Sequence, residues 1–239
     1  MQKTIFIHGL FNSGKSLIYN LFDEEKYKTI DIDYYHFEEY KPFIKEQFNK
    51  KIKNLICSSI LDKSILNLDT FFDIHKIITN QYKEYNFIFK PMIEINMLDD
   101  KRMYNENFYH LFIIRNPKVG WITNPNWIPL DEYISLFEPD LIGILKRYKD
   151  ILHIIKIEEI VDNKIINQLI DDKRLLSKVK SYTEFDLFHL DKNIKSVYKD
   201  LKIIDEKLFE VMKFLGYDIN DNKDLNELLE KINFKPYNI

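Results

Sequence analysis

The feature that most constrains this chain is a glycine loop near its amino end, Gly9-Leu-Phe-Asn-Ser-Gly-Lys-Ser16. The loop matches the pattern G-x-x-x-x-G-K-[ST] in full. An apolar run at residues 4–7 precedes it, and the segment Ser-Leu-Ile-Tyr-Asn-Leu-Phe that follows is typical of a helix opening at Lys15 or Ser16. A strand, a glycine loop and a helix in this order predict backbone N–H groups that wrap around phosphate oxygens.

The residues of this loop have distinct expected roles. The two glycines let the backbone approach a ligand closely. Lys15 supplies a mobile cation to the terminal oxygens of the bound group, and Ser16 binds Mg²⁺ or donates to an oxygen. We therefore expect contacts to a nucleotide from the following residues of the loop: Gly9, Asn12, Ser13, Gly14, Lys15 and Ser16.

Short apolar runs alternate with amphipathic segments along the chain. The alternation predicts an α/β fold with three layers, in which helices flank a mostly parallel central sheet and the C-terminal part is helical. No break in composition divides the sequence, so we expect one domain over residues 1–239. The strand-like runs are 4–7, 29–32, 86–90, 110–114 and 152–157, and the helical patterns include 37–61, 64–83, 131–149 and 202–215.

Composition narrows the class of partner. The net charge of −3 gives no general electrostatic reason to expect nucleic acid or an acidic membrane. The single Cys57 excludes an internal disulfide and is typical of a reducing compartment. The chain has no 18-residue apolar stretch that would span a membrane, and the run at residues 4–7 is too short for a signal peptide. We expect a cytoplasmic protein that acts on a small-molecule or glycan acceptor.

The segment Leu111-Phe-Ile-Ile-Arg-Asn-Pro-Lys-Val-Gly-Trp-Ile-Thr123 resembles the 3′-phosphate-binding segment of sulfotransferases that use 3′-phosphoadenosine 5′-phosphosulfate (PAPS). In that family a buried strand ends in Arg-Asn-Pro, and a Ser or Thr follows the Arg by eight residues. Arg115 and Thr123 have this spacing. The resemblance implies that the Arg115 guanidinium and the Thr123 hydroxyl bind the 3′-phosphate of PAPS or of its product PAP.

Three further segments are similar to the family and follow its order, so the resemblance covers about residues 4–220. They are Phe89-Lys-Pro91, Ile154-Ile-Lys-Ile-Glu-Glu-Ile-Val161 and Phe214-Leu-Gly-Tyr217. The phosphate loop departs from the bacterial members, because Asn12 stands where they carry a catalytic cation and Lys15 stands where they usually carry Thr. If the chain transfers sulfuryl groups, either Lys15 or another cation must stabilise the bridging oxygen.

Transfer to a hydroxyl or an amine needs a base near the acceptor. Asp33 and His36 follow the second predicted strand, and Glu94 follows Lys90-Pro91, so these three residues join Lys15 as candidate catalytic groups. Asp33 also suits a helix N-cap. No cluster of His, Cys and Asp has the spacing of a zinc site, so we expect no protein-bound metal.

Several other polar and aromatic residues have simpler expected roles. We expect Glu158 and Glu159 to be structural groups at a strand end, and His8 and His110 to be packed residues. Trp121 and Trp127, with the segment Asn124-Pro-Asn-Trp127, could form either a stacking loop for a base or acceptor, or a hydrophobic anchor for a lid.

Two other functions remain compatible with the loop. In a small-molecule kinase, Lys15 binds the β- and γ-phosphates of ATP, Ser16 binds Mg²⁺, Asp33 acts as base or metal organiser, and Arg115 binds the transferred phosphoryl group. A nucleotide-binding module without turnover is the third possibility. The identity of the acceptor cannot be deduced from the sequence.

Overall fold

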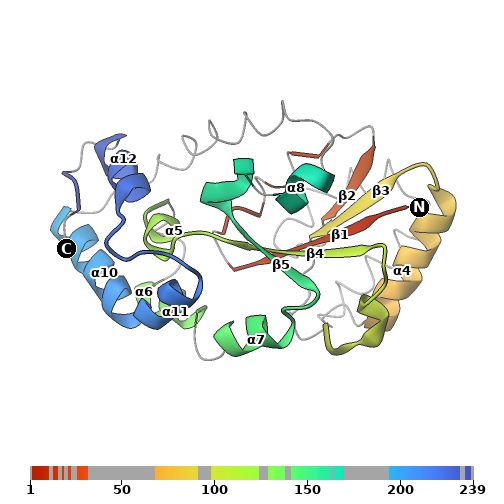
Figure 1. The fold of residues 1–239 in the computed structure, drawn as a ribbon, viewed down its shortest axis with the longest axis horizontal. Coiled ribbons are helices and arrows are strands. Elements are labelled where there is room, and N and C mark those ends of the chain that lie inside the picture. The colour runs from red at the N-terminus through yellow and green to blue at the C-terminus, as the bar shows by residue number, and fades with distance from the viewer. Residues whose placement is uncertain are drawn as a thin grey trace. The chain divides into compact units, whose positions relative to one another are not determined.

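The computed structural model describes residues 2–10, 13–15, 18, 21–22, 26–31, 68–90, 98–123, 129–137, 141–162, 164–169, 194–231 and 235–237. In this part of the chain, five strands form one sheet of order β2-β3-β1-β4-β5 (Figure 1). The strands are β1 (Thr4–Gly9), β2 (Tyr27–Asp31), β3 (Asn86–Lys90), β4 (Phe108–Ile114) and β5 (Leu152–Lys156). The strand that feeds the glycine loop is therefore the central one.

The sheet is mostly parallel, as the alternating pattern predicts. β3 pairs in parallel with β1 and with β2, so that Ile88 lies opposite both Ile5 and Thr29. The Thr4 N–H donates to the Asn107 carbonyl oxygen at 2.9 Å, which brings the start of β1 beside the start of β4. Flanking helices complete the α/β fold, and the predicted fold class is confirmed.

The described helices agree only in part with the predicted ones. The predicted helix 131–149 is two helices, and so is the predicted helix 202–215, which breaks at Leu208, where the backbone has φ −104° and ψ 12°. The helices are α4 (Leu68–Gln81), α5 (Pro117–Thr123), α6 (Leu130–Ser135), α7 (Leu141–Arg147), α8 (Lys164–Leu169), α10 (Ile194–Lys207), α11 (Phe209–Phe214) and α12 (Lys223–Lys231), with 3-10 turns η3 (Lys101–Met103) and η4 (Ile157–Asp162). Among them, none combines the length and apolar character needed to cross a bilayer.

The chain divides into two compact units. The first contains residues 1–8, 22–111 and 150–153, and the second contains residues 9–21, 112–149 and 154–239. The chain passes from one unit to the other within β1, β4 and β5. Whether the chain forms one domain stays a prediction.

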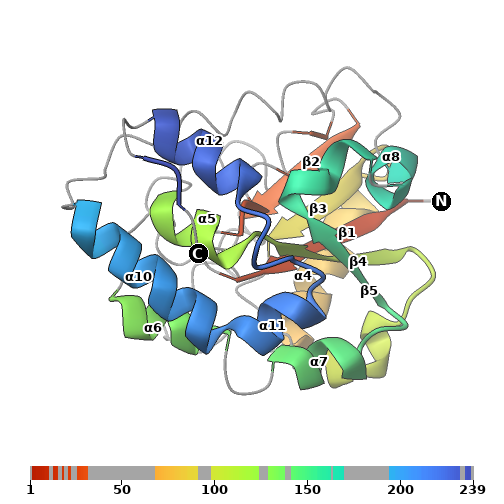
Figure 2. The ribbon, with the colours of Figure 1, turned by 60° about the vertical axis from the view of Figure 1, so that its left-hand side comes forward.

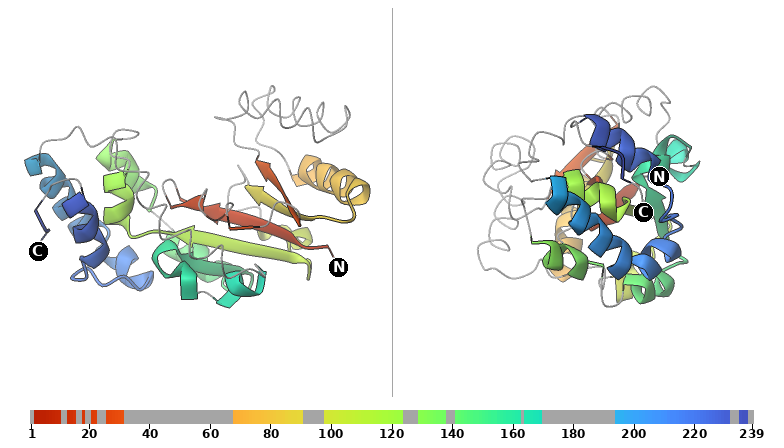
Figure 3. Two further views of the ribbon diagram at one scale, coloured as in Figure 1. Left: turned by 90° about the horizontal axis from the view of Figure 1, so that it is seen from above. Right: turned by 90° about the vertical axis from the view of Figure 1, so that its left-hand side faces the viewer.

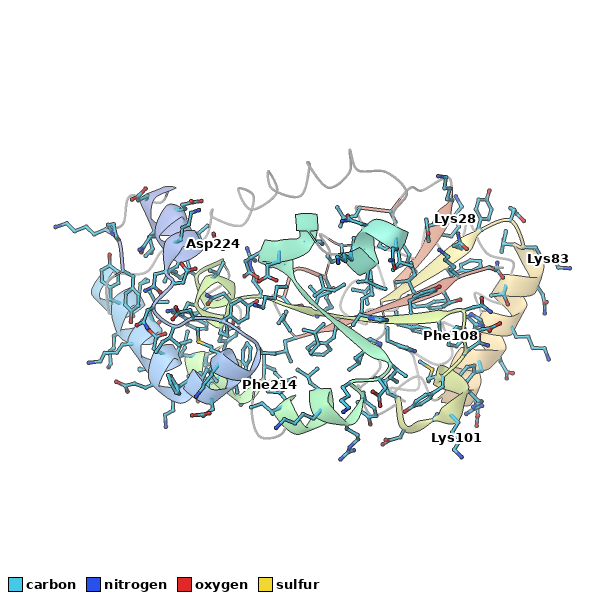
Figure 4. The ribbon with its side chains drawn as sticks, in the orientation of Figure 1. Lys28, Lys83, Lys101, Phe108, Phe214 and Asp224 are labelled. Carbon is cyan, nitrogen blue, oxygen red and sulfur yellow. The ribbon has the colours of Figure 1, made fainter. Side chains whose placement is uncertain are left out.

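In the first unit, α4 lies beside the sheet (Figure 3), and His75 of this helix contacts residues of the strands. Its Nε2 lies 2.9 Å from Thr4 Oγ1, and its ring contacts Phe89 and Phe108. Phe6 is fully buried between Phe89 and Phe108. The lysines at the edge of this unit, such as Lys83 and Lys101, are exposed, and their side chains point outward (Figure 4). The aromatic face under α4 is thus the core of this unit.

Two histidines are buried within this aromatic core. His110 Nε2 lies 2.9 Å from the Met103 carbonyl oxygen. Because a carbonyl oxygen only accepts, the proton of His110 must be on Nε2, and its Nδ1 must then accept a hydrogen bond from His8 Nε2 at 3.2 Å. His8 and His110 are therefore packed residues, as the sequence predicts, and the neutral form of His110 is the one that satisfies both bonds.

Lowering the pH is expected to destabilise the protein through His110. Burial lowers the pKa of His110 from 6.5 to about 4. The unfolded chain therefore takes up a proton before the folded protein does. The contribution to stability is complete above pH 6.5 and is lost as the pH falls toward 4, with a loss of about 2 kcal/mol by pH 5. Urea unfolding of the wild type and of His110→Gln at pH 7 and pH 5 measures this difference.

The exposed Lys83 provides the control for this experiment. Lys83→Gln should keep the pH dependence of the wild type, whereas His110→Gln should reduce it. Burial also lowers the pKa of His75 to about 4, so His75 should keep its own share of the pH dependence. An equal slope of unfolding free energy against pH in wild type and His110→Gln would contradict the assignment.

In the second unit, α5 packs between α10 and α12 (Figure 2). Leu225, Leu228 and Leu229 recur at helical spacing along α12, so they lie on one face of it. They meet Val119 and Ile122 of α5 in one apolar cluster, which also contains Val197, Leu201 and Tyr237. The cluster anchors the helix that directly follows β4.

Candidate phosphate-binding site

The glycine loop begins at the carboxyl end of β1, as predicted. Gly9 has φ +149°, a conformation that side chains disfavour. A Cβ atom at Gly9 would lie 2.5 Å from the Ile113 carbonyl oxygen, so the backbones of the loop and of β4 are in direct contact. Glycine is therefore required at position 9 for two reasons, namely the positive φ of the backbone and its close contact with β4.

The other residues of the loop that the structure describes are Leu10, Ser13, Gly14 and Lys15. Gly14 has φ +87°, which again requires glycine. The Lys15 Nζ donates to the carbonyl oxygens of Gly9 and Leu10, each at 2.7 Å, so its ammonium lies at the start of the loop. The Ser13 Oγ is buried and has no hydrogen-bond partner among the described residues. Because buried hydroxyls normally have a partner, this group suits a loop that takes up a ligand oxygen.

The predicted Arg-Asn-Pro segment forms the turn between β4 and α5. Arg115 follows the last residue of β4 and is only 6% exposed. Asn116 is the N-cap of α5, because its Oδ1 accepts from the Lys118 N–H at 3.0 Å and its carbonyl oxygen accepts from the Gly120 N–H at 2.8 Å. Pro117 occupies the first helical position, which suits its fixed φ. The three residues thus end a strand, cap a helix and start it.

A carboxylate from another segment holds this turn. Glu158 lies in η4, directly after β5, and its Oε1 accepts from the Asn116 N–H at 2.7 Å. Its Oε2 accepts from the Tyr217 O–H at 3.0 Å. Burial raises the pKa of Glu158, while the hydrogen bonds from Asn116 and Tyr217 and the charge of Arg115 act in the opposite direction. Glu158 is thus a structural group, as predicted, and it acts on the turn that carries Arg115.

Tyr217 reaches Glu158 because of how α11 ends. The Gly216 N–H donates to the Lys213 carbonyl oxygen, and the Tyr217 N–H donates to the Met212 carbonyl oxygen. Together with φ +74° at Gly216, these two bonds form a Schellman motif. The segment Phe214-Leu-Gly-Tyr217 therefore stops the helix and turns Tyr217 toward Glu158.

The glycine loop and Arg115 lie at a topological switch point. The chain leaves β1 toward β2 at one edge of the sheet and leaves β4 toward β5 at the other edge. β1 and β4 are neighbours, and Gly9 at the end of β1 touches Ile113 near the end of β4. Open α/β sheets bind ligands outside the carboxyl ends of such a pair of strands. The site is therefore built at the place where this fold binds ligands.

The structure describes only part of the predicted site. Gly9, Ser13, Gly14, Lys15 and Arg115 all belong to the second unit. Thr123 ends α5 and Lys90 ends β3, but their side chains lie outside the described part. The remaining predicted residues also lie outside it, namely Asn12, Ser16, Asp33, His36 and Glu94, so their roles stay predictions.

Trp121 does not form a stacking loop. Its ring is 2% exposed and lies 5.3 Å from the ring of Tyr133, and its Nε1 donates to Asp200 Oδ2 at 3.3 Å. Tyr133 in turn donates to the Pro117 carbonyl oxygen at 2.9 Å. For Trp121 the hydrophobic anchor is therefore the correct alternative, whereas Trp127 lies outside the described residues.

Sequence reasoning missed a buried lysine on α5. Lys118 is fully buried and forms an ion pair with Asp205 Oδ1 at 3.0 Å. Its Nζ also donates to Asn222 Oδ1 at 2.6 Å and to the Ile219 carbonyl oxygen at 2.9 Å. Tyr237 donates to the second oxygen of Asp205 at 2.9 Å. No local signal identifies this lysine, since lysines are normally exposed.

Comparison with known proteins adds little to this geometry. No model of a known family matches the sequence, and no curated protein matches it. Among solved structures, shikimate kinase from Bacteroides thetaiotaomicron is similar over 77% of this chain and 99% of that chain, with 15% identity and a TM-score of 0.32. This similarity is too weak to transfer an activity, so the site must be judged from its own residues.

Proposed function

We propose that this chain is a sulfotransferase that moves a sulfuryl group from PAPS to a hydroxyl or an amine. One observation carries the proposal. Two separate elements whose chemistry suits anions, the glycine loop and Arg115, follow adjacent strands at the switch point. A nucleotide with phosphate groups on both its 5′ and 3′ positions needs two such subsites, whereas the triphosphate of ATP is one contiguous group.

In this reaction the acceptor oxygen or nitrogen attacks the sulfur atom, and the bond from sulfur to the bridging oxygen breaks. The bond electrons leave with the 5′-phosphate of PAP, and the acceptor proton passes to a base. The glycine loop and Lys15 hold the 5′-phosphosulfate and stabilise the leaving oxygen. Arg115, with Thr123, binds the 3′-phosphate. Asp33, His36 and Glu94 are the proposed bases.

A small-molecule kinase is the second candidate. The observation in its favour is the complete Gly-Lys-Ser ending of the loop, with Lys15 held at the start of the loop by two carbonyl oxygens. In this case ATP with Mg²⁺ is the donor, and Arg115 stabilises the transferred phosphoryl group.

Calorimetric titration with PAP in the absence of metal, and with ATP and Mg²⁺, distinguishes the two donors. We expect the wild type to prefer PAP over adenosine 5′-monophosphate (AMP). Arg115→Lys keeps the charge but loses the planar fork, so it should weaken PAP binding about tenfold and leave AMP binding nearly unchanged.

Lys146→Met is the matched surface control, because Lys146 is exposed on α7. It should bind both nucleotides like the wild type. Tight binding of ATP with Mg²⁺ together with no preference for PAP would overturn the sulfotransferase in favour of the kinase.

A further inference from the structure

Three segments that are far apart in the sequence meet at the turn after β4. They contribute Asn116, Glu158 and Tyr217, and we call these three residues the turn clamp. We propose that Glu158 is a positioning residue that orients Arg115 for a 3′-phosphate, and that Tyr217 holds Glu158 in place. The inference rests on the proposed function and deepens it, because it names the groups that prepare the 3′-phosphate subsite.

The geometry of the peptide group supports this role. The Asn116 N–H belongs to the same planar peptide unit as the carbonyl group of Arg115. Glu158 Oε1 accepts a hydrogen bond from this N–H at 2.7 Å. This bond fixes the orientation of the peptide plane between Arg115 and Asn116. The side chain and the carbonyl oxygen of Asn116 are already engaged in capping α5. The turn cannot rotate without breaking one of these bonds.

Both oxygens of the Glu158 carboxylate are engaged, which fixes its orientation. One binds the Asn116 N–H and the other binds the Tyr217 O–H, so neither can swing toward a ligand without losing a bond. The charge of Arg115 attracts the same carboxylate. A negative group beside a phosphate subsite would repel the ligand if it were loose, so holding it against the turn lets it orient Arg115 without competing for the subsite.

The ring of Tyr217 is itself fixed from two sides. The Schellman motif at Gly216 sets its backbone, and the Lys156 Nζ lies 4.9 Å from the centre of its ring. Lys156 in turn donates to the Gly216 carbonyl oxygen at 2.9 Å. The backbone at Gly216 and the contact with Lys156 therefore direct the hydroxyl of Tyr217 toward Glu158.

The test compares the affinities for PAP and for AMP, because only PAP carries the 3′-phosphate. Tyr217→Phe removes a single hydroxyl and keeps the ring. We expect PAP to bind about tenfold more weakly to this variant, and AMP to change less than twofold, since one hydrogen bond to a charged group is lost at the 3′ subsite alone. Calorimetric titration of the full chain measures both affinities.

Two further variants sharpen the test. Glu158→Asp keeps the charge but is one methylene shorter, so it cannot reach both donors and should also lose selectivity for PAP. Tyr198→Phe is the matched control, because it removes a tyrosine hydroxyl that donates to the Lys235 carbonyl oxygen away from the clamp. It should bind both nucleotides like the wild type.

The outcomes separate this inference from the function on which it rests. Equal weakening of PAP and AMP in Tyr217→Phe would show a purely structural role and overturn the inference. A wild type that prefers PAP, with a Tyr217→Phe variant that keeps this preference, would overturn the inference and leave the sulfotransferase standing. A wild type with no preference for PAP would overturn both.

Discussion

Replacing Lys118 by methionine is expected to lower the free energy of unfolding by about 4 kcal/mol. The methionine fills a similar volume, but it has no ammonium group, so every partner of that group loses its donor. Asp205, which is 9% exposed, is then left as a buried carboxylate with only the Tyr237 hydroxyl as a described partner. An unpaired buried charge is among the largest destabilising changes that one substitution can cause. Urea unfolding at neutral pH measures the loss.

Two variants control for this prediction. In Lys118→Met/Asp205→Asn, the remaining partner is neutral, so part of the lost stability should return. Lys199→Met removes an exposed lysine from α10 and should change stability by less than ~0.5 kcal/mol. A loss in Lys118→Met no larger than that in Lys199→Met would show that the ammonium group reaches water.

Gly9→Ala is expected to destabilise the protein by about 3 kcal/mol and to abolish nucleotide binding. Alanine disfavours φ +149°, and its Cβ would lie 2.5 Å from the Ile113 carbonyl oxygen. Because the Ile113 oxygen is a backbone atom and a Cβ is fixed to its own Cα, the clash can be relieved only by moving the loop away from β4. The loop would then no longer present its N–H groups together. Thermal unfolding and titration with PAP measure the two effects.

Gly216→Ala is the matched control for this substitution. Gly216 also has a positive φ, but its Cβ would meet only the flexible end of Lys156, at 3.2 Å. We expect a loss of about 1 kcal/mol, with PAP binding weakened through Tyr217 but AMP binding kept. If Gly9→Ala behaved like Gly216→Ala in both assays, the close packing of the loop on β4 would have no functional importance.

Local signals in the sequence predicted much of the fold. β3 lies at the predicted residues 86–90, and β1, β4 and β5 differ from their predicted runs by at most two residues at either end. These strands are short, apolar and bounded by polar residues, so the pattern is decisive. The strand end at Arg115 was predicted, but α5, which follows it, is not among the predicted helices, although Asn116 as N-cap and Pro117 as first helical residue are its local signals.

Helix boundaries were predicted less well, for an identifiable reason. The apolar period that indicates one helix over residues 202–215 continues through Leu208, whose side chain is fully buried although its backbone leaves the helical region. The spacing of apolar residues reflects which side chains are buried. A residue that breaks the helix but keeps its side chain buried therefore leaves this spacing unchanged. The break between α6 and α7 was predictable by contrast, because Pro139 lies between them in the sequence.

The partners of Asn116 and Lys118 could not be predicted from the sequence. Asn116 and Glu158 are 42 residues apart, and Lys118 and Asn222 are 104 residues apart. A glutamate after a strand and a lysine in a helix are common and ordinarily exposed, so neither position carries a local signal. These contacts follow from how the chain is packed, which the sequence pattern does not encode over such separations.

The buried Lys118 also has a consequence for the order of folding. Its ammonium group can leave water only when Asp205, Ile219 and Asn222 are in place, and all three are synthesised about 90 residues or more after it. A chain that emerges from the ribosome amino end first therefore holds the glycine loop and Arg115 long before α5 can settle. Such distant contacts also slow folding. The nascent protein should thus complete the turn at Arg115 late, after the helices α10 to α12 have formed.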